Sequence, residues 1–283
     1  MFRSTHILSG ATLYEKPPQT PADFQTALAA LREKQAAFAA LEAAERARML
    51  ATFADRLEAA APRLAHMICE EVGRCLRECQ AELAKSVELV RHCAQTAPAL
   101  LAPRRVATPA ARSEIRFEPL GVVFAVMPWN YPVWQILRFA VPALALGNAC
   151  AVKPAPSVPR ITAALFDTIG DALPLIPAWL AHQHVEHAIA EADAFAFTGS
   201  AATGRLLAAA AAGRLKKSVL ELGGSNPFIV LPDADLEQAA RDACHSRFRD
   251  AGQSCNAAKR IILTDPIAEP FIRLFLTECA IIL

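Results

Sequence analysis

The chain has 283 residues, 54% of them hydrophobic and 20% charged, and its 29 basic and 28 acidic side chains nearly cancel. A chain of this length can bury one large core or two ordinary ones, so we expect a globular protein. The balanced charge provides no basic surface for nucleic acid or for acidic membranes. A small molecule is therefore the expected partner.

Cysteine usage predicts a reducing compartment. The eight cysteines show neither the paired C-x-x-C spacing of a zinc site nor the density of a disulfide scaffold. The first 19 residues lack the apolar core of a secretory signal. We therefore predict reduced thiols, no metal site and a cytoplasmic protein.

The uncharged stretch 119–137 raises the question of a membrane span. Its prolines would interrupt a helix in a bilayer, and its polar side chains would be costly to bury in the hydrocarbon core. We therefore favour a buried strand, a loop and a helix, and expect no membrane association. The interrupting residues are Pro119, Pro128, Asn130, Pro132 and Gln135.

Helical patterning dominates the first part of the chain. Residues 22–102 are rich in Ala, Leu, Glu, Arg and Gln, with apolar residues at helical spacing, which predicts several helices. The residue pattern changes at 104–119, where every second residue from Ser113 through Ile115 to Phe117 falls on one face, which indicates one strand of a hairpin. A Pro-Leu-Gly turn follows it.

From residue 122 onward, strands alternate with helices, which predicts an α/β fold with a mostly parallel sheet. A Pro-rich link precedes residue 181, and beyond Pro227 the pattern gives strand, helix, loop, strand and a final helix from about 267. The predicted strands are 122–127, 149–153, 194–199 and 217–224, and the predicted helices are 134–147, 161–173, 181–191 and 202–213.

Four short motifs follow one another along this pattern. They are PWN at 128–130, KP at 153–154, FTGS at 197–200 with ELGG at 221–224, and GQSC at 252–255. In this order and spacing they resemble the aldehyde dehydrogenase family, over about residues 22–275. The stretches PWNYPVWQILR and GNACAVKPAPSVP are most similar to the succinate-semialdehyde branch.

The resemblance implies a Rossmann-type cofactor domain and an incomplete α/β catalytic domain. We place the N-terminal helices and the NAD(P)-binding domain in residues 1–222, with an oligomerisation-type hairpin at 104–119. Residues 223–283 then form part of the catalytic domain with the nucleophile loop. Homo-oligomers are usual in the family.

Cys255 is the candidate nucleophile. It lies in a loop between a predicted helix and strand, where a thiol can meet a substrate. Thiolate adds to an aldehyde and later leaves, giving a thiohemiacetal and then a thioester. The alternative is a small buried thiol, the ordinary fate of a cysteine.

Two further residues complete the catalytic set that the resemblance implies. Asn130 follows a strand at its carboxyl end, where its amide can donate to a developing oxyanion. Glu221 ends another strand and corresponds to the general base that activates the deacylating water. Each has an ordinary alternative, a turn residue for Asn130 and a solvated charge for Glu221.

Cofactor binding is expected at the same edge of the sheet. Lys153 matches the family lysine that bonds ribose hydroxyls, and the segment from Gly199 to Gly204 lets a diphosphate approach a helix N-terminus. An ordinary helix cap is the alternative for that segment. We left Arg138 and Arg160 outside the site. The predicted cofactor-binding residues are Trp129, Lys153, Gly199, Ser200, Gly204 and Gly223.

The sequence departs from the family in two ways. Pro156 replaces the Glu that favours NAD in many members, so NADP is expected to bind at least as well. The E-x-F-G-P motif that holds the nicotinamide ribose is absent from 256–283, which indicates a C-terminally truncated chain. The expected function is NAD(P)-dependent oxidation of an aldehyde to a carboxylic acid, with succinate semialdehyde as the candidate substrate. The alternative is an inactive remnant that at most binds dinucleotide.

Overall fold

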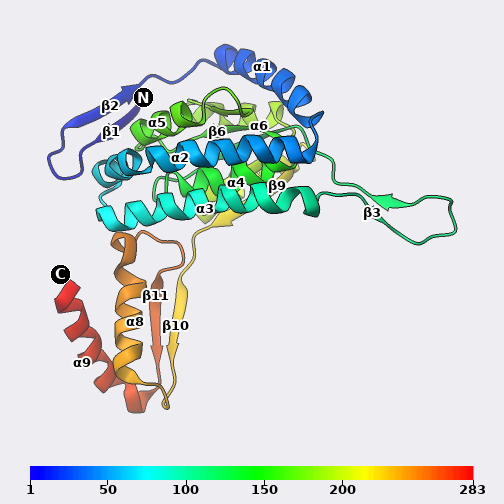
Figure 1. The fold of residues 1–283 in the computed structure, drawn as a ribbon. Helices are drawn as coiled ribbons and strands as arrows, with labels where there is room; N and C mark the ends of the chain where they lie inside the picture. The colour runs from blue at the N-terminus through cyan, green and yellow to red at the C-terminus, as the bar shows by residue number, and fades with distance from the viewer. Residues whose placement is uncertain (283) are drawn as a thin grey trace. The chain divides into compact units, whose positions relative to one another are not determined.

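The computed structural model describes residues 1–282 of the chain, which form two compact units, Met1–Glu221 and 222–282. Helices and strands alternate along most of the chain (Figure 1). We describe each unit separately.

Three long helices follow one another in residues 21–100 of the first unit, as the helical patterning predicted. Helix α1 begins with a capping box in which Thr20 and Asp23 bond each other's backbone N–H, and α2 ends at Gly73 with a φ of 77°. Helices α2 and α3 run side by side (Figure 1). Their bounds are α1 Pro21–Ala39, α2 Ala43–Val72 and α3 Leu76–Leu100.

The centre of this unit is a five-stranded sheet in the order β7-β6-β5-β8-β9. Strand β5 pairs in parallel with both β6 and β8, and β6 pairs in parallel with β7. This agrees with the predicted parallel α/β fold. The bounds are β5 Val122–Val126, β6 Ala149–Lys153, β7 Leu175–Pro177, β8 Ala194–Gly199 and β9 Lys217–Leu222.

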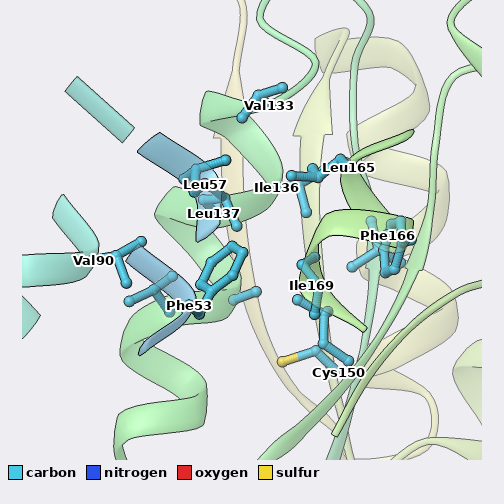
Figure 2. Packing of buried hydrophobic residues seen from close by; sticks show 14 of the residues in the cluster. Phe53, Leu57, Val90, Val133, Ile136, Leu137, Cys150, Leu165, Phe166 and Ile169 are labelled. Carbon is cyan, nitrogen blue, oxygen red and sulfur yellow. The ribbon is translucent and has the colours of Figure 1, made fainter. Parts of the chain in front are cut away.

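Helices cover both faces of the sheet, and alternate strand residues face two separate cores. On β5, Val123 and Ala125 pack toward α2, α3, α4 and α5, whereas Val122 and Phe124 pack toward α1, α6 and α7. Figure 2 shows part of the first core. The bounds are α4 Trp134–Ala145, α5 Pro159–Ile169, α6 Val185–Glu191 and α7 Ala201–Ala212, with a 3-10 turn at His182–His184 before α6.

Two small antiparallel hairpins complete the first unit. The pair β1 (Phe2–Thr5) and β2 (Thr12–Lys16) was not predicted, because its polar alternation is short. The hairpin at 104–119 is present, but its paired strands are only β3 (Arg104–Arg105) and β4 (Glu114–Ile115). It projects from the sheet and helices (Figure 1).

Two predicted segments of the first unit need correction. The helix expected over 161–173 ends at Ile169, because Gly170 adopts a φ of 66° and the chain turns there. The Pro-rich link before residue 181 contains strand β7, which is an edge strand of the sheet. An edge position tolerates Pro177, since it needs no second ladder of hydrogen bonds.

The second unit has a two-stranded parallel sheet and two helices. Val230, Ala240, Ala243, Ile267 and Phe271 form its core. In residues 1–282 we find no helix of the length and apolarity that a bilayer span requires. The bounds are β10 Asn226–Val230, α8 Leu236–Phe248, a 3-10 turn Arg249–Gly252, β11 Ala258–Leu263 and α9 Asp265–Ile282.

Candidate functional site

The carboxyl ends of three neighbouring strands carry most of the predicted site. Asn130 follows β5, Lys153 ends β6 and Gly199 ends β8. From β5 the chain continues to β6 and β7 on one side of β5, and it later returns to form β8 on the other side of β5. The strand order therefore reverses between β5 and β8. Such a switch point is where open parallel sheets bind ligands.

Lys153 is buried although it carries an ammonium group. Its side chain is 1% exposed, and burial lowers its pKa to about 8. Among the described residues its Nζ makes one hydrogen bond, to the carbonyl of Pro154 at 3.4 Å, and lies 5.5 Å from the ring centroid of Phe2. An ammonium with three donors therefore retains capacity for a ligand hydroxyl.

The segment after β8 leads directly into a helix. Ser200 is the N-cap of α7, and its Oγ accepts from the backbone N–H of Thr203 at 3.2 Å. A Cβ at Gly199 would lie 2.5 Å from Cζ of Phe197, so any side chain at this position would have to displace the Phe197 ring. Gly204 is buried in the first turn of α7. The geometry combines a helix cap with a helix N-terminus at the carboxyl-end edge of the sheet.

The loop that carries Asn130 is attached to the helical layer. Arg74, at the start of the α2–α3 connection, donates from Nη1 to the carbonyl oxygen of Asn130 at 3.0 Å. Trp129 is 45% exposed, so its indole is available to a ligand or to another part of the protein. Sequence reasoning missed Arg74, because an arginine between two helices has no local signal that points to this loop.

Glu221 pairs with a residue that sequence reasoning left outside the site. Nη2 of Arg138, on α4, lies 2.6 Å from Oε1 of Glu221, near the end of β9, and both side chains are partly exposed. The pair borders a cavity of about 410 Å³ that is lined mainly by α4, β8 and β9. Val219 and Phe139 contribute apolar surface to it.

In the second unit, Cys255 lies on an exposed loop between the Arg249–Gly252 turn and β11. Nζ of Lys259 donates to the carbonyl oxygen of Cys255 at 3.2 Å and to that of Gly224 at 2.7 Å. The lysine thus joins the loop of Cys255 to Gly224 of the ELGG segment. The preceding turn is strained, because Asp250 and Ala251 have φ values of 56° and 55°.

The structure therefore brings part of the predicted site together. Asn130, Lys153 and Gly199 share one sheet edge, and Cys255 and Gly224 share one loop cluster. Cys255 belongs to a different unit from Asn130 and from Glu221, so the catalytic grouping of these three residues stays a prediction. Among the residues that the structure describes, no group of three His, Cys, Asp or Glu side chains is arranged to hold a metal ion.

A parallel sheet with helices on both faces, whose strand order reverses between β5 and β8, has the architecture of doubly wound α/β folds. Residues 2–281 match the model of the aldehyde dehydrogenase family. The chain belongs to the aldehyde dehydrogenase family.

Curated relatives include several succinate-semialdehyde dehydrogenases. An aldehyde dehydrogenase of Paenarthrobacter nicotinovorans is 38% identical over 299 residues, covering 96% of this chain and 62% of the relative. A probable NADP-dependent succinate-semialdehyde dehydrogenase of Synechocystis is 42% identical over 242 residues, covering 83% and 53%. The chain thus spans about three fifths or less of the length of these relatives.

Solved structures show the same fold. Succinate-semialdehyde dehydrogenase from Burkholderia pseudomallei is similar with a TM-score of 0.91 at 32% identity, covering 98% of this chain and 59% of that one. The enzyme from Streptococcus pyogenes in complex with NADP+ gives a TM-score of 0.93 at 25% identity, covering 98% and 63%. The predicted family and fold class are therefore confirmed.

Proposed function

We propose that this chain supplies the dinucleotide site and the nucleophile of an enzyme that oxidises an aldehyde to a carboxylic acid with NAD(P). This proposal rests chiefly on the positions of Lys153, Gly199 and Asn130. All three lie at the carboxyl ends of neighbouring strands, where the strand order of the sheet reverses. The family match over residues 2–281 supports it.

The residues at this edge fit a dinucleotide. Lys153 holds a buried ammonium with donors to spare for ribose hydroxyls, and the N-terminus of α7 next to Gly199 suits a diphosphate. Pro156 stands where a carboxylate would repel a 2′-phosphate. We therefore propose that NADP binds at least as well as NAD, in line with the NADP-dependent succinate-semialdehyde dehydrogenases among the relatives of the chain.

The protein's own groups carry the chemistry around the cofactor. The Cys255 thiolate forms a bond to the aldehyde carbon, and the carbonyl electron pair moves onto oxygen, where the Asn130 amide donates a hydrogen bond. NAD(P)+ held by Lys153 and the N-terminus of α7 would serve as the hydride acceptor, so that the carbon bound to Cys255 would be oxidised to a thioester. Glu221 then removes a proton from a water molecule as the water attacks the thioester carbon. The carbon–sulfur bond breaks, which regenerates the Cys255 thiolate and releases the carboxylic acid.

Arg138 suggests which aldehyde is preferred. Its guanidinium borders the cavity beside Glu221 and already binds a carboxylate. A substrate that carries a carboxylate at the end opposite its aldehyde would pair with the Arg138 guanidinium. Together with the relatives' names, this supports a semialdehyde such as succinate semialdehyde.

The hairpin at 104–119 is proposed as a contact between copies of the chain. It projects from the first unit (Figure 1) and exposes Val106, Ile115 and Phe117 by 42 to 47% each. Exposed apolar side chains on a projecting hairpin favour burial against a partner. Size-exclusion chromatography of a Phe117→Ser variant tests this proposal.

The proposed activity is tested by following formation of reduced cofactor with succinate semialdehyde and with propanal, using NAD and NADP in turn. Cys75, which is also exposed, provides a matched control. We expect turnover that is lost in Cys255→Ser and retained in Cys75→Ser. Folded protein that produces no reduced cofactor with either aldehyde would contradict the proposed dehydrogenase activity.

A dinucleotide-binding protein without turnover is the second candidate. It is favoured by one observation: most of the proposed cofactor residues lie in the Met1–Glu221 unit, whereas Cys255 lies in the other. Thermal stabilisation by NADP without any turnover would support this candidate. Turnover that depends on Cys255 would exclude it.

A further inference from the structure

An ion pair with no exposed surface lies beside the loop of Asn130. Nη1 of Arg74 is 2.5 Å from Oε2 of Glu82, and both side chains are 0% exposed. Arg74 follows Gly73 at the end of α2, and Glu82 lies on α3. Nη2 of Arg74 also donates to the carbonyl of Glu78 at 3.0 Å, so the α2–α3 connection fixes the orientation of the guanidinium.

The second oxygen of Glu82 caps helix α4. Its Oε1 accepts from the backbone N–H of Val133 at 3.0 Å and from that of Trp134 at 2.9 Å. The N-cap residue of α4 is Val133, whose side chain cannot accept a hydrogen bond. A carboxylate from α3 therefore satisfies the N–H groups that a local Ser or Asp would satisfy elsewhere, and its charge is favourable at a helix N-terminus.

Arg74 holds the other end of the same loop. In addition to its bond to the Asn130 carbonyl, its guanidinium carbon lies 4.3 Å from the ring centroid of Tyr131. The segment from Asn130 to Trp134 is thus attached to one buried ion pair through hydrogen bonds at both ends and a ring contact between them. These contacts link residues that are about 50 positions apart in the sequence.

We propose that the Arg74–Glu82 pair is a positioning device that fixes the backbone of residues 130–134 and thereby places the Asn130 amide for the oxyanion. This inference rests on the proposed function of Asn130. Oxyanion donors act only when they are held in place before the reaction, because reorientation during it would cost the stabilisation they provide. Neither Arg74 nor Glu82 is a catalytic residue in this scheme.

An ion pair suits this purpose better than apolar packing would. A buried pair gives little net stability compared with hydrophobic residues of the same volume. Its directional bonds specify one backbone conformation at the Asn130 loop, which apolar side chains of equal volume would not. The pair therefore specifies the geometry of this loop.

A second buried carboxylate provides a matched control. Glu71, on α2, accepts from the backbone N–H groups of Arg160 at 3.0 Å and Ile161 at 2.8 Å, and so caps α5 in the same manner. It is 6% exposed. Glu71→Gln removes a similar charge from a similar cap, but the affected loop follows β6 and does not contain Asn130.

The experiment compares wild type, Glu82→Gln, Arg74→Lys and Glu71→Gln by hydrogen exchange at a temperature where all are folded. We expect amide exchange in residues 130–137 to rise about tenfold or more in Glu82→Gln, and less in Arg74→Lys, which retains the charge. In Glu71→Gln the rise should instead appear in residues 158–163. Unchanged exchange at 130–137 in folded Glu82→Gln would overturn the inference.

Kinetics separate positioning from general destabilisation. We expect Glu82→Gln to lower kcat by about tenfold to a hundredfold with little change in KM for the aldehyde. In an Asn130→Ala background the same substitution should cost almost nothing more, because its effect passes through Asn130. Full additivity of the two losses would overturn the inference.

The inference and the proposed function fail in different ways. If the wild type shows no turnover, the proposed function fails, and the exchange data alone decide whether the pair fixes the loop. If Glu82→Gln does not fold, Arg74→Lys supplies the same comparison with the ion pair retained in altered geometry.

Discussion

Nη2 of Arg138 and Oε1 of Glu221 lie 2.6 Å apart, which joins α4 to β9 at the mouth of the cavity between them. Both side chains are partly exposed, at 37% and 51%, so we expect the pair to contribute less than about 1 kcal/mol to stability. The pair is important because it places the positive charge of Arg138 beside Glu221, the proposed general base.

Arg138→Gln should therefore change substrate preference more than stability. We expect the Tm to stay within about 2 °C of wild type. The KM for succinate semialdehyde should rise about tenfold or more, because the cation that meets its carboxylate is gone, and the KM for propanal should not change. Equal effects on both aldehydes would show that Arg138 acts through Glu221 and not through the substrate.

Lys153 should make stability rise with pH. Burial lowers its pKa to about 8 in the folded protein, against 10.5 as its ordinary value. Between these two values the unfolded chain keeps a proton that the folded chain has released, so raising the pH through this window favours folding. The full effect corresponds to about 3 kcal/mol.

Comparison with Lys153→Met isolates this effect from other groups that titrate above pH 8. The free energy of unfolding of wild type minus that of the variant should increase from pH 8 to pH 10.5, measured by urea denaturation. His182, whose pKa is lowered chiefly by the Lys153 charge, titrates below this window and does not disturb it. Parallel profiles for the two proteins would contradict the prediction.

The sequence predicted the sheet well, because its signals are local. The apolar runs at 122–127 and 194–199 are buried on both faces, as parallel strands require. Strand β7 was missed because it has only three residues and includes Pro177. These differences concern the edges of the fold, whereas the central strands that position Asn130, Lys153 and Gly199 were found.

The supporting residues of the site could not be predicted in the same way. Glu82 lies in a helix rich in charged residues, where a carboxylate usually faces water. Its burial and its bonds to residues 133 and 134 arise only when α3 packs against α4. Arg138 was left out for the same reason, since its partner Glu221 is more than 80 positions away.

Two of the proposed cofactor glycines should respond differently to alanine. A Cβ at Gly199 would lie 2.5 Å from Cζ of Phe197, a core residue that is 4% exposed. At Gly223 a Cβ would meet nothing within 4 Å. We expect Gly199→Ala to lose about 1–3 kcal/mol by overpacking and to weaken NADP binding, and Gly223→Ala to stay near wild type in stability. Equal Tm values for the two variants would contradict the placement of Phe197.

The cysteines should be alkylated in an order set by burial. Cys75 and Cys255 are exposed and should react first with iodoacetamide. Burial raises the pKa of Cys79 to about 12 and that of Cys244 to about 11, so these thiols should react only after unfolding. Mass spectrometry of peptides after brief treatment, with and without urea, measures the order. Early labelling of Cys79 in folded protein would contradict the packing of α3.

Lys259 should control the reactivity of the nucleophile loop. Its two hydrogen bonds, at 2.7 Å to the Gly224 carbonyl and 3.2 Å to the Cys255 carbonyl, connect the segments that directly precede β10 and β11. Lys259→Met keeps the length of the side chain but removes both bonds, so the loop should sample more conformations. Because both carbonyls remain exposed to water, we expect little loss of stability.

The measurement is the rate of Cys255 alkylation, which Lys259→Met should change by about threefold or more while Cys75 reacts as before. Arg260→Met is the control, since Arg260 bonds the neighbouring carbonyl of Ser225 at 3.0 Å and makes no bond to Cys255. If both variants change the Cys255 rate equally, the effect comes from loosening the β10–β11 pair as a whole. A selective effect of Lys259 would show that this lysine orients the cysteine loop.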